Sequence, residues 1–399
     1  MPSTAPRTPL ELLAELVAIP SHVSQPDGIA AIAEIVGSHL AAVGFEPMPA
    51  APPSRHTPEW AERVLCPEVE FDALLDPFVW RRRGDAAGDL LVLADLDAAL
   101  ALDATDCRLV VNGGRATGPA IADMKGGLVV VVEAMRRVSA ERGASPSITV
   151  VLAADEQAGS LRSAATIERL GAEASWCVCV ECGRDGGRLM RSRGHIGVGL
   201  LTATGLEAHA GSARAAGINA VTALARGIAA IDGDAISGRH ATVTPTIVSG
   251  GRRRSVVPGE ASVVLDLRAR DGRAWEALES RVRAALAAAD PGERLHLDLF
   301  VHRPGLPATD LTAWFLALVH DVGERVAVDV AAVDSLAAGS SAFVDSTRIP
   351  VLDGLGPAGG ALMTPEEFIE VDTLESRAAL LAALVGELGT RSAPRSTSG

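Results

Sequence analysis

The chain has 399 residues, of which 48% are hydrophobic and 22% charged, and its formal net charge is −14. This length exceeds what one ordinary hydrophobic core organises, so two domains are expected. The negative charge argues against nucleic acid or an anionic membrane as a partner. No apolar run reaches the roughly 18 residues of a membrane span, and five cysteines fit free thiols in a reducing compartment, so a cytoplasmic protein is expected.

The first predicted helix carries a clear start signal. Thr8 is a good N-cap, Pro9 suits the first helical position, and Glu11 completes a capping box. A second helix is predicted over residues 28–43. Residues 50–76 are rich in proline and are expected to form an irregular surface excursion.

Four short apolar runs predict buried strands, at residues 90–94, 148–154, 176–180 and 350–352. Helical patterns lie between several of them, most clearly over residues 124–138. Continuous apolar strands that alternate with helices are typical of an α/β fold with a parallel-rich sheet covered by helices.

Acidic residues follow the first three of these predicted strands. Asp95 and Asp97 end the first, Asp155 and Glu156 end the second, and Glu181 ends the third. The carboxyl ends of parallel strands meet at one edge of a sheet, where such folds bind their ligands. Acids also follow strands simply as turn residues, but this explains one or two ends better than three.

Between residues 193 and 302 the pattern changes to longer strands with two helices. We predict strands at residues 197–204, 242–249 and 261–269, and helices at residues 218–231 and 273–289. The predicted organisation is therefore one α/β domain made from residues 1–192 and 303–399, with a smaller α+β domain, residues 193–302, inserted into it.

Several motifs share an order and spacing that resembles a known family. They are Asp123-Met-Lys-Gly-Gly, Asp155-Glu-Gln-Ala-Gly, Glu181, Ala208-His-Ala-Gly and Gly356-Pro-Ala-Gly-Gly-Ala-Leu-Met-Thr. The resemblance is to the di-zinc exopeptidases and deacylases of peptidase family M20, which include glutamate carboxypeptidase, acetylornithine deacetylase, succinyl-diaminopimelate desuccinylase, aminoacylase and carnosinase. It covers residues 10–388 and implies a zinc-exopeptidase-like domain, with the insert acting as a lid and dimerisation domain of a homodimer.

The resemblance also implies where two metal ions would be held, at Asp95, Asp123, Gln157, Glu181 and Met363. The family has histidine at the first and last of these positions and an acid at the third. A neutral amide and a thioether are poor zinc ligands, so the position formed by Asp123, Gln157 and Met363 is predicted not to hold a metal. The all-carboxylate position formed by Asp95, Asp123 and Glu181 could hold one Mg²⁺, Mn²⁺ or Zn²⁺, or none.

Other family roles can be carried over by motif. Glu156 matches the general base, and His209 matches a histidine that reaches the reacting carbonyl across the dimer interface. The positions matching the family's substrate-binding groups are Arg268, Ser340, Gly339 and Ser255, the last of which is asparagine in many relatives. Apart from the resemblance, a salt bridge for Arg268 and a loop-stabilising role for His209 would be ordinary explanations.

Three functional hypotheses follow. The first is an amide-processing enzyme that acts on a small N-acyl amino acid or a dipeptide-like carboxylate, with Glu156 as acid and base and at most one metal. Hydrolysis is the default reaction, while acyl transfer, cyclisation and elimination stay open because the means of activating water is reduced. The second is a catalytically inactive relative that binds an amino-acid-like ligand or serves as a partner subunit. The third is a structural or interaction protein.

Overall fold

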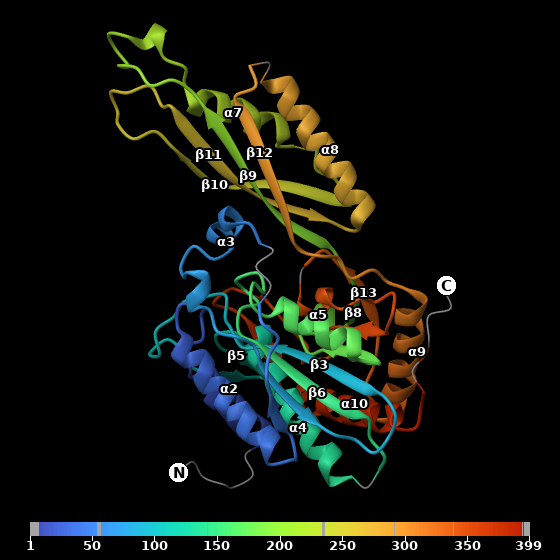
Figure 1. The fold of residues 1–399 in the computed structure, drawn as a ribbon. Coiled ribbons are helices and arrows are strands. Elements are labelled where there is room, and N and C mark those ends of the chain that lie inside the picture. Colours follow the sequence, from blue (N-terminus) through green and yellow to red (C-terminus); the bar gives the residue numbers. More distant parts are fainter. Residues whose placement is uncertain are drawn as a thin grey trace.

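The computed structural model describes residues 8–53, 57–141, 143–233, 236–290, 292–337, 339–392 and 394. Two main sheets, each with its own hydrophobic core, organise the molecule (Figure 1). The larger sheet carries the acidic strand ends, and the smaller one stands above it, joined to it at the start of β9 and the end of β12.

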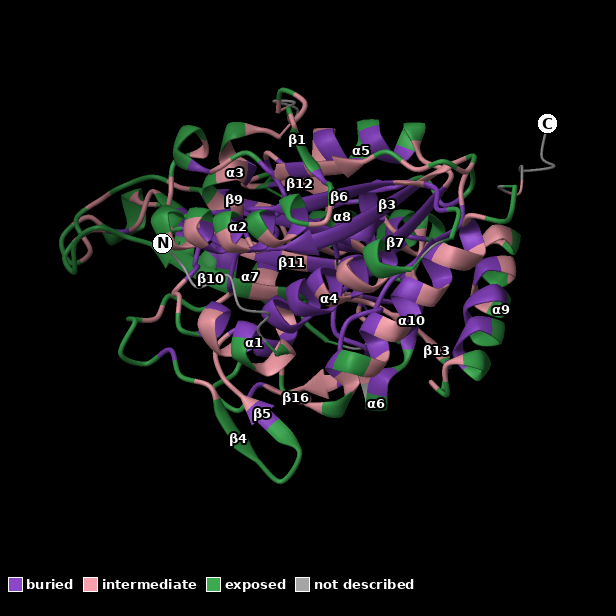
Figure 2. Ribbon diagram, turned by 90° about the horizontal axis from the view of Figure 1, so that it is seen from below, coloured by how far each residue is buried: buried purple, intermediate pink, exposed green. Residues whose placement is uncertain are grey.

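The larger sheet has the strand order β1-β2-β6-β3-β7-β14. The pairs from β6 to β14 are parallel, and β1 and β2 add two antiparallel strands at one edge. The central strands are buried along their length (Figure 2). The strands are β1 (Glu46–Met48), β2 (Phe78–Arg82), β3 (Asp89–Asp95), β6 (Ser147–Ala153), β7 (Trp176–Cys179) and β14 (Val351–Leu352).

Helices cover both faces of this sheet, because alternate side chains of each buried strand point to opposite sides. On β3, Leu90 and Val92 belong to the core under one set of helices, whereas Leu91 and Leu93 face the opposite layer. The first set is α1 (Pro9–Val17), α2 (Pro26–Ala41), α4 (Gly126–Ala140), α9 (Asp310–Arg325) and α10 (Asp372–Leu388); the second is α5 (Ala164–Glu173) and the short turn η4 (Ser340–Phe343).

Smaller elements surround the acidic edge. Strands β8 and β13 form a parallel pair, and β15, β16, β5 and β4 form a separate antiparallel sheet in that order. Their bounds are β4 (Val110–Asn112), β5 (Arg115–Thr117), β8 (Leu189–Arg193), β13 (Ala332–Ser335), β15 (Gly359–Gly360), β16 (Phe368–Glu370), η2 (Ile121–Lys125) and α6 (Arg184–Gly187).

The smaller sheet is antiparallel, in the order β10-β11-β9-β12, and helices α7 and α8 cover one of its faces (Figure 1). Leu201, Val263 and Leu265 point into the core beneath these helices. The elements are β9 (His195–Thr204), β10 (Ala241–Gly250), β11 (Glu260–Ala269), β12 (Leu295–Arg303), α7 (Ala220–Ile231), α8 (Gly272–Ala289) and η3 (Arg214–Ala216).

The predicted α/β fold class, the Thr8 capping box and the four apolar strands are confirmed. Two expectations were wrong in part. The stretch 50–76 contains helix α3 (Glu59–Leu65) and the turn η1 (Phe71–Ala73), and the Asp123 motif precedes the helix, which begins at Gly126. Among the described helices, none is long and apolar enough to cross a membrane.

Candidate active site

The acids at the strand ends gather at one edge of the larger sheet. Asp95 ends β3, while Glu156 and Glu181 follow β6 and β7, the strands on either side of it. All three are buried. Burial raises the pKa of Asp95 well above its usual value, and the nearby charges of Glu156 and Glu181 add to this effect. The three side chains therefore form one electrostatically coupled cluster.

Asp97 holds the loop that carries Glu156. Its two carboxylate oxygens accept hydrogen bonds from the backbone N–H groups of Glu156 and Gln157, at 2.9 and 2.7 Å. The carboxylate is almost completely buried, and burial followed by the charge of Glu156 raises its pKa. Asp97 thus acts as a positioning residue for the candidate general base.

Asp123 enters the cluster from η2, where its φ of −123° and ψ of 76° depart from helical geometry. Glu367 supports this loop by accepting the N–H groups of Ala122 and Asp123, at 2.8 and 3.0 Å, and it also accepts the N–H of Met363 at 3.1 Å. Burial raises the pKa of Asp123 to about 7, with the charges of Glu156 and Glu367 contributing next.

Lys125, the only lysine of the chain, anchors the same loop. Its Nζ donates a hydrogen bond to the carbonyl oxygen of Ile19 at 2.7 Å, so it ties the Asp123 motif to the end of α1. The side chain is buried, and burial lowers its pKa to about 8.

Two buried arginines contact the carboxylates. Arg303, the last residue of β12, lies 3.0 Å from Oε1 of Glu156 and also donates to the carbonyl oxygen of Glu156. Arg193, the last residue of β8, donates to Oε2 of Glu181 and lies 2.8 Å from Asp353. Both carboxylates thus already have cationic partners from the protein itself.

The residues at the family's metal positions fit a pair of zinc ions poorly. Gln157 directs Nε2 at Oδ2 of Asp123 over a long 3.5 Å contact, and Met363 is half-exposed. In the other position, Asp95 accepts a hydrogen bond of 2.6 Å from Ser340, and Glu181 is held by Arg193. A thioether and an amide do not replace imidazole and carboxylate as zinc ligands.

The matched substrate-binding positions lie in three places. Ser340 and Gly339 adjoin the acidic cluster, as the Ser340–Asp95 hydrogen bond shows. Arg268 lies on β11 and forms a two-bond ion pair with Asp266, at 2.8 and 3.2 Å. Arg268 on β11 and Arg303 on β12 both pair with Ile196 of β9, so the two arginines lie two strand spacings apart, at roughly 10 Å between their backbones. Burial, followed by the charges of Arg303 and Arg268, lowers the pKa of His302 to about 3.

His209 and Ser255 lie beyond the far end of β9, remote from the acidic cluster of their own chain. Ten residues of β9 at about 3.3 Å each place this end roughly 30 Å away. Nδ1 of His209 accepts the N–H groups of Gly211 and Ser212, at 3.1 and 3.0 Å. A neutral ring then carries its proton on Nε2, which is left to donate outward.

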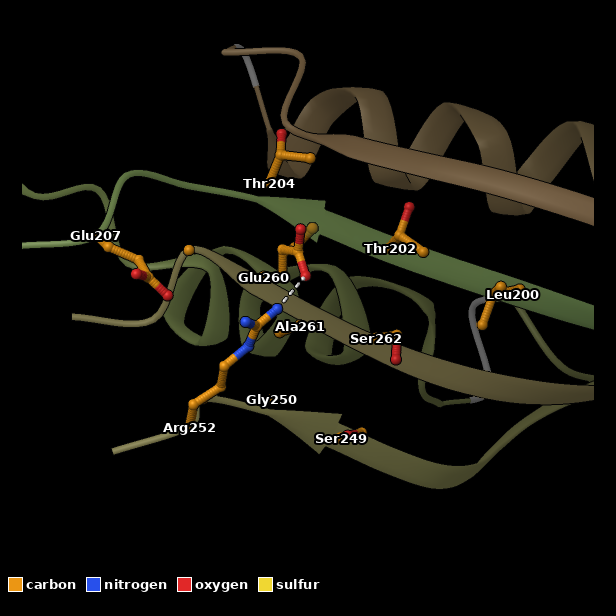
Figure 3. A pocket seen from close by; sticks show the side chains of 13 residues that line it. Leu200, Thr202, Thr204, Glu207, Ser249, Gly250, Arg252, Glu260, Ala261 and Ser262 are labelled. Atoms are coloured by element: carbon orange, nitrogen blue, oxygen red, sulfur yellow. Dashed lines mark hydrogen bonds and ion pairs between the residues drawn. The ribbon is translucent and has the colours of Figure 1, made fainter. Parts of the chain in front are cut away.

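A cavity of about 360 Å³ opens beside Asp123 and Met363. Its wall combines apolar side chains, including Leu100, Leu102 and Val110, with the charged Arg108. A separate hollow of about 450 Å³ lies on the smaller sheet around Arg252 and Glu260 (Figure 3). The first cavity is lined by Asp123 of the acidic cluster itself, so it is the candidate for holding part of a substrate.

Sequence patterns missed four residues that shape the cluster, namely Arg193, Arg303, Asp353 and Glu367. Each contacts the cluster through tertiary structure. Arg193 and Glu181, for example, are brought together by the turn between β7 and β8. Two of the four had a nearby sequence signal: Asp353 directly follows the strand predicted at residues 350–352, and Glu367 lies three residues after the Met363 motif.

Comparisons with known proteins agree with this fold. Residues 191–294 match the family described as the M20 peptidase dimerisation domain. A succinyl-diaminopimelate desuccinylase of Methylococcus capsulatus is 25% identical over 78% of this chain and 86% of its own length. Carboxypeptidase G2 of a Pseudomonas species is 23% identical over 95% and 89%.

Solved structures extend the likeness of the fold to nearly the whole chain. A tripeptidase of Staphylococcus aureus superposes with a TM-score of 0.75 at 15% identity, over 96% of this chain and 98% of that one. An M20 metallo-carboxypeptidase of Sulfolobus solfataricus gives 0.70 at 13% identity, over 97% and 100%. In sequence and fold the chain is thus similar to M20 peptidases, and the resemblance inferred from its motifs is confirmed.

Proposed function

We propose that the protein is an amide-bond hydrolase that acts on a small N-acyl amino acid or a dipeptide-like carboxylate. The observation that carries this proposal is the placement of Glu156, a buried carboxylate positioned by Asp97 at the carboxyl edge of the sheet. Relatives named as a desuccinylase and a carboxypeptidase support the reaction class.

In the proposed reaction, Glu156 accepts a proton from a water molecule, whose oxygen attacks the amide carbonyl. The C–N bond then breaks, and Glu156 returns the proton to the leaving amine. Nε2 of His209 from a second subunit donates to the carbonyl oxygen, and Arg268 holds the substrate carboxylate. Gly339, Ser340 and Ser255 complete the binding positions.

The cavity beside Asp123 suggests which part of the substrate is apolar. Leu100, Leu102 and Val110 offer an apolar wall, and Arg108 adds a positive charge. Pockets of this size and character suit a small acyl group or side chain. The donor set near Asp95 and Glu181 allows at most one Mg²⁺, Mn²⁺ or Zn²⁺, and the roles proposed for Glu156, His209 and Arg268 do not involve that ion.

The smaller sheet, within residues 193–302, is proposed to act as a lid and to pair two copies of the chain. Its edge strand β10 exposes Ile247 and Val248, at 58% and 63%. An exposed apolar edge favours pairing with another strand. The match of residues 191–294 to a dimerisation domain supports a homodimer.

The Arg303–Glu156 ion pair favours a second candidate, an inactive relative that binds an amino-acid-like ligand or serves as a partner subunit. A carboxylate held by a buried guanidinium is less available to take a proton. Acyl transfer, cyclisation or elimination would be consistent with the same residues when water is poorly activated.

Glu156→Gln separates these possibilities, because glutamine preserves the shape and the contact with Arg303 but cannot accept the proton. Turnover of a panel of N-acetyl amino acids and dipeptides should fall by about 10²–10⁴-fold, the usual contribution of general acid–base catalysis, while substrate affinity changes little. Glu279→Gln, which removes a partly exposed acid that pairs with Arg283 on α8, is the matched control. Unchanged turnover in Glu156→Gln would exclude Glu156 from the mechanism, and absence of turnover in the wild type across the panel would favour the binding role.

A further inference from the structure

Arg193 lies at the centre of the acidic edge with its side chain fully buried. Its guanidinium donates to Oε2 of Glu181 and, through Nε, to Oδ2 of Asp353 at 2.8 Å. Asp353 is itself completely buried and has Ser341 as a further hydrogen-bond donor. One arginine fork therefore joins two carboxylates that come from different parts of the chain.

The two carboxylates that Arg193 joins also belong to a group of potential metal ligands. Among the described residues, the one group of three potential ligands whose donor atoms lie within 4.8 Å of one another is Cys179, Glu181 and Asp353. The guanidinium of Arg193 contacts two of these three. A divalent ion placed among these donors would face a positive charge and would have to displace at least one buried hydrogen bond.

The backbone opposite is shaped to admit the arginine. A Cβ atom at Gly339 would lie 2.2 Å from Oε1 of Glu181 and 2.8 Å from Cζ of Arg193. A side chain at residue 339 would therefore collide with the ion pair. Burial lowers the pKa of Arg193, but the charges of Asp353 and Glu181 outweigh it and raise the pKa above its usual value, so the side chain stays protonated.

We propose that Arg193 is a built-in cation that takes the place of a metal ion at Glu181, so that the cluster is assembled without any divalent metal. This inference deepens the proposed function, since it concerns the same cleft. The proposed function allows one metal ion near Asp95 and Glu181, whereas the ion pair of Arg193 predicts that none binds at Glu181. Arg193 is a positioning residue here, because it acts by holding Glu181 and Asp353.

The test compares metal responses of the wild type and Arg193→Met. The wild type, purified without chelator, should contain substoichiometric zinc and manganese, and neither EDTA nor added ZnCl₂ should shift its Tm. In Arg193→Met the carboxylates lose their cation, so the Tm should fall, and ZnCl₂ should restore part of the loss by binding Cys179, Glu181 and Asp353. Arg191→Met is the control: it removes an exposed arginine of the same strand as Arg193, β8, whose partner Asp334 lies on β13. This variant should gain no response to zinc.

A purely structural role for Arg193 would lower the Tm of the variant without creating a response to zinc, and that result would overturn the proposal. A second result would also overturn the proposal: a wild type that contains stoichiometric metal and loses it in Glu181→Gln. This comparison of metal content remains decisive if Arg193→Met fails to fold. These experiments measure metal content and Tm, whereas the proposed hydrolase function is tested by turnover. The failure of one proposal can therefore be distinguished from the failure of the other.

Discussion

At the scale of single residues, the cluster differs from a metal centre in how its charge is balanced. Arg193 and Arg303 contact Glu181 and Glu156. Among the described residues, the side chains of Asp95 and Asp123 instead accept hydrogen bonds from the neutral groups of Ser340 and Gln157. Buried carboxylates without a cation resist ionisation. The cluster is therefore expected to keep protons that the unfolded chain releases.

Asp123 makes this expectation measurable. Its pKa is raised from 3.8 to about 7, first by burial. Between these values the folded protein holds a proton that the unfolded chain has lost, so the free energy of unfolding falls as the pH rises, by at most about 1.4 kcal/mol per pH unit for one such group. Asp123→Asn has no proton to lose, so its stability relative to the wild type should increase between about pH 4 and pH 7 and stay constant above about pH 8.

Urea unfolding of both proteins across this pH range provides the measurement. Asp106→Asn, which removes an acid from the rim of the neighbouring cavity, controls for the loss of one negative charge. A constant difference in stability between Asp123→Asn and the wild type would show that Asp123 ionises alike in the folded and unfolded states.

At the scale of elements, the acidic edge was predictable because parallel strands carry their carboxyl ends together. The apolar runs located β3, β6 and β7, and the acids after them gave Asp95, Glu156 and Glu181. The short strands β8 and β13 have no comparable pattern, and β12 was not anticipated. The arginines that end β8 and β12 were therefore missed, since their partners are fixed only by the packing of distant segments.

The irregular element η2 also escaped sequence analysis, because its apolar pattern continues that of α4. Asp123 and Met124 leave helical geometry so that the aspartate can turn into the cluster, and Lys125 fastens this turn to Ile19. Lys125, the chain's only lysine, thus holds the junction between η2 and α4 in place.

Because Lys125 is the only lysine, acetylation of its amine reports on the junction between η2 and α4. Lys125 is 2% exposed, so an acetylating reagent should leave it unmodified in the native protein even near its pKa of about 8, where much of the amine is unprotonated. In urea the same reagent should modify it completely, and peptide mass spectrometry would measure both states. Equal rates of modification in native buffer and urea would contradict the buried Lys125–Ile19 contact.

At the scale of the whole molecule, the two sheets separate the residues that the proposed reaction requires. Glu156 lies at the edge of the larger sheet, whereas His209 lies beyond the far end of β9, roughly 30 Å along the strand. The family resemblance gave both residues from sequence, but the distance between them follows only from the fold. A second copy of the chain is the proposed source of the histidine, and the exposed β10 edge is the proposed contact.

Mixing two inactive variants tests this arrangement. If each site combines Glu156 of one subunit with His209 of the other, His209→Ala and Glu156→Gln homodimers should both lose turnover. A mixed dimer has one site with both substitutions and one site with neither, so random exchange of subunits should restore about a quarter of wild-type turnover. Sedimentation would establish dimers and exchange beforehand, and a mixture of Glu156→Gln with Glu156→Gln/His209→Ala, which can form no intact site, is the control. An active monomer, or no recovery after proven exchange, would mean that His209 does not act across an interface.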